Sequence, residues 1–262
     1  MIADYIEHLN KNNRKVLSVF LTAGFPAVNK FVHLALEMFE KGADMLEIGI
    51  PFSDPIADGP VIQYASQKAL AAGVTIDQIL KFVQDIRRYS DKPLILMGYA
   101  NPILSYGIDN FLKVCRDCGV NGLIVPDVPL EEYHSFWGTA PREPDIILLT
   151  TPTSPVERIK AIDRHSQGFV YCVSMTGTTG ISNKYDGHVM EHVKKTYELM
   201  AAHKMLIGFG ISGAQDVKRF APYCDGVIVG SSVIRRLITD SGDDSYASSF
   251  ALIKDLSTAC DI

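Results

Sequence analysis

Eight short apolar runs recur along this chain, and they constrain its fold more than any other feature. Between them lie longer segments whose apolar residues repeat at the i, i+3, i+4 spacing of an amphipathic helix, as from Phe31 to Phe39 and from Ile76 to Ile86. Alternating strands and helices predict parallel strands joined by crossover helices. The expected strands are Val16–Leu21, Met45–Ile50, Leu94–Met97, Gly122–Val125, Ile146–Leu149, Phe169–Val173, Met205–Ile207 and Gly226–Val229.

Eight strand–helix units in 262 residues match the usual size of a closed (β/α)8 barrel. We therefore predict an α/β fold, a TIM barrel that forms a single domain over residues 1–262. The apolar spacing from Ile2 to Leu9 predicts an extra N-terminal helix within residues 1–14. An open, doubly wound sheet is the alternative, but its GxGxxG fingerprint after the first strand is absent.

Composition and charge exclude several classes of function. The formal net charge is -5 and no basic segment is present, so we expect no nucleic-acid partner. We also expect no membrane association, because no apolar segment approaches the length that spans a bilayer. Five scattered cysteines, an odd number, favour reduced thiols and a cytoplasmic location. Cys115 and Cys118 form a lone CxxC pair, which we interpret as packing residues, and we predict no metal site.

The second apolar run carries the clearest sign of chemistry. Glu47 lies inside it. Burying an ionisable group in an apolar strand costs free energy, so such a group is expected to have a partner or a chemical function. The following loop, rich in Pro and Gly, adds Asp54 and Asp58. Loops at the carboxyl ends of barrel strands hold the active site. We predict that one of Glu47 and Asp58 exchanges protons with a raised pKa while the other stays ionised. A buried structural role remains the alternative for Glu47, and a role in the turn is the favoured alternative for Asp54.

Glycine-bearing turns follow the last three expected strands and predict a phosphate site. They contain Gly177 to Gly180, Gly208 to Gly213 and Gly230 to Ser232. Glycine lets the backbone approach an anion, and a helix N-terminus supplies unpaired N–H groups. Ordinary strand-to-helix turns remain the alternative for any one of them.

Several large side chains could wall a flat apolar ligand at the mouth of the barrel, although packing in the core is the alternative for each. Tyr171, on the sixth expected strand, and Tyr99, after the third, could reach the same mouth. The other candidate wall residues are Phe20, Ile62, Met97, Leu149 and Phe209.

These motifs together resemble the tryptophan synthase α subunit. The longest is EIGIPFSDPIADGPVIQ, and the shorter ones are LTAGFP, GYANPI, VPDVPLEE, GTTG, IGFGIS and VGSS. They occur in order from about residue 15 to residue 236, which covers nearly the whole expected barrel. The glycine turns alone are weak evidence, because many phosphate-binding barrels share them.

The resemblance implies a lyase that splits indole-3-glycerol phosphate by retro-aldol cleavage into indole and glyceraldehyde 3-phosphate, in tryptophan biosynthesis. Glu47 then matches the proton-transferring glutamate, Asp58 the aspartate at the indole N–H, and Tyr171 the active-site tyrosine. Thr179 matches the lid threonine. The expected phosphate clamp is Gly180, Gly210, Gly230 and Ser231, and the expected indole pocket is Phe20, Ile62, Met97, Tyr99, Leu149 and Phe209.

The resemblance also implies a partner. The α subunit docks on a β subunit that carries pyridoxal phosphate, in an α2β2 heterotetramer, and it needs no metal or organic cofactor of its own. Indole passes to the β subunit through a tunnel. Asp54, Asn101 and Pro129 match the docking side. The active-site loops are expected at 51–63 and 174–190, and their closure would couple the two sites allosterically.

One departure from the family pattern leaves a second interpretation open. Many relatives carry an Arg where this chain has Met175 in its expected lid. A lid that closes poorly would leave the site wet, so the alternative is a weakly catalytic α subunit that mainly activates the β subunit. Another phosphate-binding barrel enzyme is the remaining rival. The synthase that forms indole-glycerol phosphate would need a lysine at a strand end, whereas Lys15 and Lys92 precede their strands.

Overall fold

Eight parallel strands close into a barrel in the order in which they occur in the chain, as predicted. This is a computed structural model, and it describes residues 1–138, 143–174, 187–208, 210–240 and 245–262. The strands are β1 (Val16–Thr22), β2 (Met45–Gly49), β3 (Leu94–Met97), β4 (Gly122–Ile124), β5 (Asp145–Thr150), β6 (Val170–Val173), β7 (Met205–Gly208) and β8 (Gly226–Val229). Their ends differ from the predicted ones by at most one residue.

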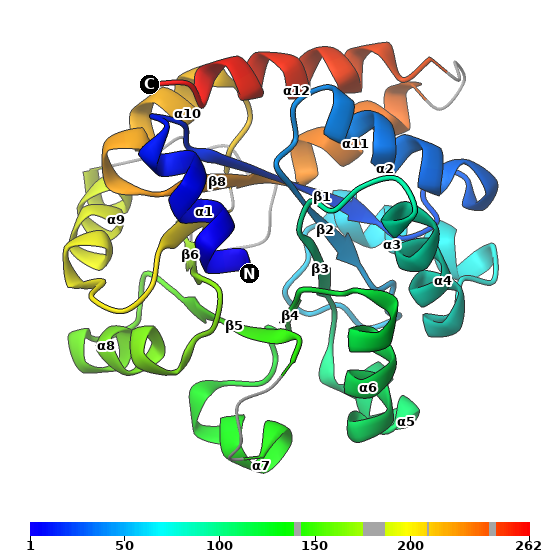
Figure 1. Cartoon of the computed structure of the whole chain (residues 1–262), viewed down its shortest axis with the longest axis horizontal. Helices are drawn as coiled ribbons and strands as arrows, with labels where there is room; N and C mark the ends of the chain where they lie inside the picture. Colours follow the sequence, from blue (N-terminus) through cyan, green and yellow to red (C-terminus); the bar gives the residue numbers. More distant parts are fainter. Residues whose placement is uncertain (139–142, 175–186, 209, 241–244) are drawn as a thin grey trace.

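Apart from the N-terminal helix, the helices surround the barrel (Figure 1). In the described part of the chain they are α1 (Ile2–Lys11), α2 (Phe31–Glu40), α3 (Pro60–Ala71), α4 (Ile76–Arg87), α5 (Ala100–Tyr106), α6 (Ile108–Cys118), α7 (Tyr133–Trp137), α8 (Val156–His165), α9 (Gly187–Leu199), α10 (Ala214–Phe220), α11 (Ser231–Thr239) and α12 (Ala247–Ala259). The segment 51–63 therefore ends in the first turn of α3, and the segment 174–190 ends in the first turn of α9.

The core has two layers because strand side chains alternate between the barrel interior and the helices. The interior cluster contains Val16, Met45, Ile95 and Ile228 among others, whereas the larger outer cluster joins strands to helices. The extra N-terminal helix α1 lies across one end of the barrel in Figure 1. Its Ile2 and Ile6 are fully buried in the interior cluster. The amphipathic pattern of α1 thus closes the amino end of the barrel, so the opposite end is left for a ligand.

Polar contacts fasten the same amino end. Arg14 Nη2 lies 3.1 Å from Asp44 Oδ2, and the Leu17 N–H donates to that oxygen at 2.9 Å. Arg14 Nη1 donates to Asp261 at 2.6 Å. One guanidinium therefore connects the start of β1 to β2 and to the C-terminus, in a place where no ligand needs to enter.

Truncation of Ile6 to alanine should remove part of the plug at the amino end. We expect Ile6→Ala to lower the free energy of unfolding by about 2–5 kcal/mol, because a buried cavity would remain. Urea denaturation measures the change. Tyr89→Ala is the control, since that side chain is 75% exposed, and it should change stability by less than about 0.5 kcal/mol. Equal effects of both changes would show that α1 does not stabilise the barrel.

Candidate active site

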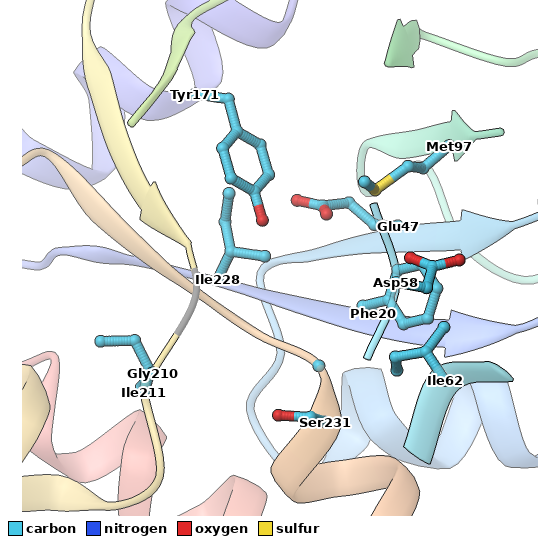
Figure 2. A pocket seen from close by; sticks show the side chains of 11 residues that line it. Phe20, Glu47, Asp58, Ile62, Met97, Tyr171, Gly210, Ile211, Ile228 and Ser231 are labelled. Atoms are coloured by element: carbon cyan, nitrogen blue, oxygen red, sulfur yellow. The ribbon is translucent and has the colours of Figure 1, made fainter. Parts of the chain in front are cut away.

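A cavity at the carboxyl ends of the strands brings together residues from distant parts of the sequence (Figure 2). Its polar side chains are Glu47, Asp58, Tyr171 and Ser231. The remaining lining residues are Phe20, Ile62, Met97, Gly210, Ile211, Ile228 and Gly230. An apolar wall with a few converging polar groups is the usual form of a small-molecule site.

Glu47 is fully buried on β2, and its side chain points into the barrel toward Tyr171 (Figure 2). The Ser18 hydroxyl donates a hydrogen bond to Glu47 Oε1 at 2.9 Å. Oε2 has no hydrogen-bond partner among the described residues. Burial raises the pKa of Glu47 to about 8, and the bond from Ser18 opposes that rise. At neutral pH this carboxyl group is therefore mostly protonated and can serve as an acid.

Two glycines make room for the aromatic residues beside Glu47. A Cβ at Gly49 would lie 2.4 Å from the Phe20 ring, and a Cβ at Gly208 would lie 2.0 Å from the Tyr171 hydroxyl oxygen. Both distances are far below van der Waals contact, so a larger residue at either strand end would force the neighbouring aromatic ring to move. Burial, and then the nearby charges of Glu47 and Asp58, raise the pKa of Tyr171 well above its usual value. Tyr171 is therefore a neutral phenol in this site.

Asp58 reaches the cavity from the loop between β2 and α3. The Tyr99 hydroxyl accepts the Ala57 N–H at 3.1 Å and lies near enough to the Asp58 carboxyl group to influence its pKa. The Gln63 side chain donates to the Asp58 carbonyl oxygen at 2.8 Å. Burial raises the pKa of Asp58 to about 6, while the nearby Tyr99 hydroxyl group opposes the rise. Asp58 is thus mostly ionised at neutral pH, in contrast to Glu47.

The turns after β7 and β8 form the other side of the cavity. Gly230 precedes the first residue of α11, Ser231, whose side chain is seen in Figure 2. The Ser232 hydroxyl donates to the Ile211 carbonyl oxygen at 3.1 Å, which ties the two turns together. Gly210 has a φ of +88°, a backbone conformation that favours glycine. Exposed N–H groups at the start of a helix can bind a phosphate here.

Not every predicted residue lines this cavity. Tyr99 is buried behind the Asp58 loop, and Leu149 lines a neighbouring cavity that shares Met97 with the first. Asp54, Asn101 and Pro129 are exposed. The predicted Thr179, Gly180 and Phe209, together with Met175, lie outside the described residues.

Three residues near the site were missed by reasoning from the sequence. Ile211 and Ile228 line the cavity, and Ser18 contacts Glu47. Ser18 did carry a signal, because it is a polar residue within an apolar strand and is separated from Phe20 by two positions. Residues two apart on a strand point to the same side.

Comparison with known proteins agrees with this geometry. The family model described as "Tryptophan synthase alpha chain" matches residues 6–258. The tryptophan synthase alpha chain of Geotalea uraniireducens is 42% identical over 244 residues, which cover 93% of this chain and 91% of the relative. The chain belongs to the tryptophan synthase alpha chain family.

Solved structures with this fold include members of the same family. The structure of Mycobacterium tuberculosis tryptophan synthase superposes with a TM-score of 0.90 at 30% identity, covering 100% of this chain and 98% of the other. The subunit alpha of Legionella pneumophila gives a TM-score of 0.85 at 34% identity, covering 99% and 98%. Both the fold and the family expected from the sequence motifs are therefore confirmed.

Membership of the tryptophan synthase alpha chain family fixes the overall reaction. The protein is a carbon–carbon lyase that cleaves indole-3-glycerol phosphate to indole and glyceraldehyde 3-phosphate in tryptophan biosynthesis. It assembles with the β chain, which holds pyridoxal phosphate, while the alpha chain has no cofactor of its own. The rival assignments to other phosphate-binding barrel enzymes are thereby excluded.

The buried carboxyl group of Glu47 should make stability depend on pH. Its pKa is about 8 in the folded chain, against an ordinary value of 4.5 for an exposed glutamate. Between these values the unfolded chain binds fewer protons, so the free energy of unfolding should fall as pH rises from about 5 to 8, by on the order of 3 kcal/mol. Urea denaturation of wild type and Glu47→Gln across this range tests it, since the variant should lose that part of the pH dependence. If the free energies of unfolding of wild type and Glu47→Gln change with pH in parallel, the raised pKa of Glu47 is contradicted.

Proposed function

We propose that Glu47 and Asp58 divide the cleavage of indole-3-glycerol phosphate between them. The observation that carries this proposal is the pairing, in one cavity, of a buried carboxyl group with an oxygen that has no partner among the described residues and a second carboxyl group with a lower pKa. Two carboxyl groups whose environments separate their pKa values can act as an acid and as an anion at the same pH.

The proposed reaction begins with proton transfer from Glu47 to C3 of the indole ring. The ring nitrogen then becomes cationic, and ionised Asp58 stabilises its N–H. The Glu47 carboxylate next removes the proton from the hydroxyl group on the adjacent glycerol carbon. The electrons of that O–H bond form the aldehyde, and those of the broken C–C bond return to the ring. Indole and glyceraldehyde 3-phosphate leave, and Glu47 has regained its proton.

The rest of the cavity suits the two ends of this substrate. Phe20, Ile62 and Met97 supply apolar surface beside Asp58, as an indole ring requires (Figure 2). Gly230 and Ser231 start α11 on the opposite side, and Gly210 lies near them, so backbone N–H groups would hold the phosphate. Tyr171 stands across from Glu47 as a neutral phenol that could orient the glycerol. Phe209, Thr179 and Gly180 stay predictions, as does Leu149 as part of the indole pocket.

We further infer that the whole chain acts as one barrel domain in the cytoplasm. None of the helices in the described ranges is long and apolar enough to cross a bilayer. All five cysteines are buried and unpaired, which suits a reducing compartment.

Asp54, Asn101 and Pro129 are exposed on loops and helix starts that follow β2, β3 and β4. We propose this rim of the barrel as the face that docks on the β chain.

The presence of both carboxyl groups in one cavity also favours an active lyase over a silent activator. Release of glyceraldehyde 3-phosphate from indole-3-glycerol phosphate, with and without added β chain, tests this directly. We expect turnover in both conditions and a higher rate with the β chain, because ordering of the loops completes the site. A folded chain with no turnover in either condition would support the alternative, an alpha chain that mainly activates its partner.

Removal of either carboxylate should abolish most of the turnover. We expect Glu47→Gln and Asp58→Asn each to lower kcat by at least about 10²-fold, because each variant loses proton transfer or charge stabilisation. Glu40→Gln, an exposed site on α2, is the control and should keep the wild-type rate. Circular dichroism of all three checks the fold. A variant at Glu47 or Asp58 that keeps the wild-type rate would remove that residue from the mechanism.

Loss of the Tyr99 hydroxyl should shift the acid limb of the pH profile. The limb reports ionisation of Asp58, with a pKa of about 6, and Tyr99 holds that pKa down. In Tyr99→Phe the pKa of Asp58 should rise, so kcat/KM should begin to fall at a higher pH than in wild type. Tyr106→Phe is the matched control, because the Tyr106 hydroxyl bonds Asp77 on the surface at 2.7 Å. If the acid limb of Tyr99→Phe coincides with that of wild type, Tyr99 does not control the pKa of Asp58.

A further inference from the structure

Ser18 is a polar residue in the interior of the barrel, at a place where its neighbours are apolar. It is fully buried on β1, between Val16 and Phe20 on the same side of the strand. The Ser18 Cα pairs with Met45 across the β1–β2 ladder, and Phe20 pairs with Glu47. Ser18 therefore lies one step closer to the amino end than Glu47, and its hydroxyl reaches diagonally to the Glu47 carboxyl group. It does not line the cavity itself.

The hydroxyl of Ser18 donates the one hydrogen bond that the structure gives to the Glu47 side chain within the described residues. The flanking strand β3 places Ile95 beside Glu47. The titratable groups that face Glu47 are Tyr171 from β6 and Asp58 from the loop after β2, and both of them lie on the cavity side. No cationic side chain lines the cavity in the part of the chain that the structure describes.

We propose that Ser18 is a positioning residue for the cleavage reaction, one that holds Glu47 Oε1 and leaves Oε2 to exchange the proton with the substrate. This inference rests on the proposed role of Glu47. A serine hydroxyl carries a single proton. While that proton is donated to Oε1, the proton of the neutral carboxyl group sits on Oε2, the oxygen without a partner.

The bond from Ser18 has two consequences for the reaction. It fixes the plane of the carboxyl group, so the same oxygen that gives a proton to the ring carbon can then accept one from the glycerol hydroxyl. It also stabilises the carboxylate that exists between these two transfers, because a hydrogen bond to a charged acceptor is stronger than one to a neutral acceptor. Substrate binding does not depend on this hydrogen bond, since Ser18 lies behind Glu47.

The test is the steady-state kinetics of Ser18→Ala, measured on the full chain with the β chain present. We expect kcat to fall about tenfold, as for loss of a hydrogen bond to a charged group, with KM changed less than about twofold. The alkaline limb of kcat/KM, which reports loss of the Glu47 proton, should move up by about one pH unit. Ser18→Thr keeps the hydroxyl group and should restore both kcat and the position of the alkaline limb. Ser18→Cys is the substitute for this rescue variant if threonine does not fit.

Thr150→Val is the matched control, because Thr150 is a buried strand hydroxyl on β5 that does not line the cavity. It should leave kcat and the pH profile unchanged. If Ser18→Ala keeps the wild-type profile, the proposal is overturned. It is also overturned if the activity of Ser18→Ala falls without a shift of the alkaline limb and without rescue by Ser18→Thr or Ser18→Cys, since Ser18 would then act only in packing.

An infrared pH titration separates failure of this inference from failure of the proposed mechanism. The band of the protonated Glu47 carboxyl group is identified by its absence in Glu47→Gln. It should disappear at a higher pH in Ser18→Ala than in wild type, and an unmoved titration would overturn the role of Ser18. If Glu47→Gln itself keeps wild-type turnover, the proposed mechanism fails, while the infrared titration still reports whether Ser18 bonds to Glu47.

Discussion

Burial of the Glu47 carboxyl group inside an apolar barrel disfavours its charged form, and the arrangement of the site depends on this constraint. The side chain is fully buried and has a single hydrogen bond, from Ser18, within the described residues. Its pKa consequently rises to about 8. A protein that only needed a stable core would place an apolar residue on β2. Keeping a carboxyl group there lowers stability at neutral pH and provides an acid that can protonate carbon.

The surroundings of Asp58 differ in the way that its proposed task requires. It lies on a loop rather than a strand, and the nearby Tyr99 hydroxyl group lowers its pKa. Its pKa of about 6 leaves it mostly ionised where Glu47 is mostly neutral. The two groups are chemically similar, so their division of labour comes from burial and hydrogen bonding. Ser18 and Tyr99 have parallel roles, since each hydroxyl group lowers the pKa of one carboxyl group.

Steric fit at the strand ends is the second requirement of the site. Phe20 and Tyr171 occupy space that a side chain at Gly49 or Gly208 would fill. The barrel can therefore hold two aromatic rings beside a buried carboxyl group without widening. The amino end is closed by α1 and by the Arg14 contacts. Chemistry is in this way confined to the carboxyl end, where Gly230 and Ser231 begin α11.

The sequence by itself determined the fold class, the order of the eight strands and the family, because strand and helix periodicities are local and the motif around Glu47 and Asp58 is long. It also marked Glu47 as unusual, since a carboxyl group in an apolar strand is visible without coordinates. Only the tertiary structure decided which neighbours each group meets. Ser18 on β1 contacts Glu47 on β2, and Tyr99 bonds to Ala57 in the loop that carries Asp58 rather than lining the cavity. Such contacts depend on strand register and loop path, which bring together residues that are distant in the sequence.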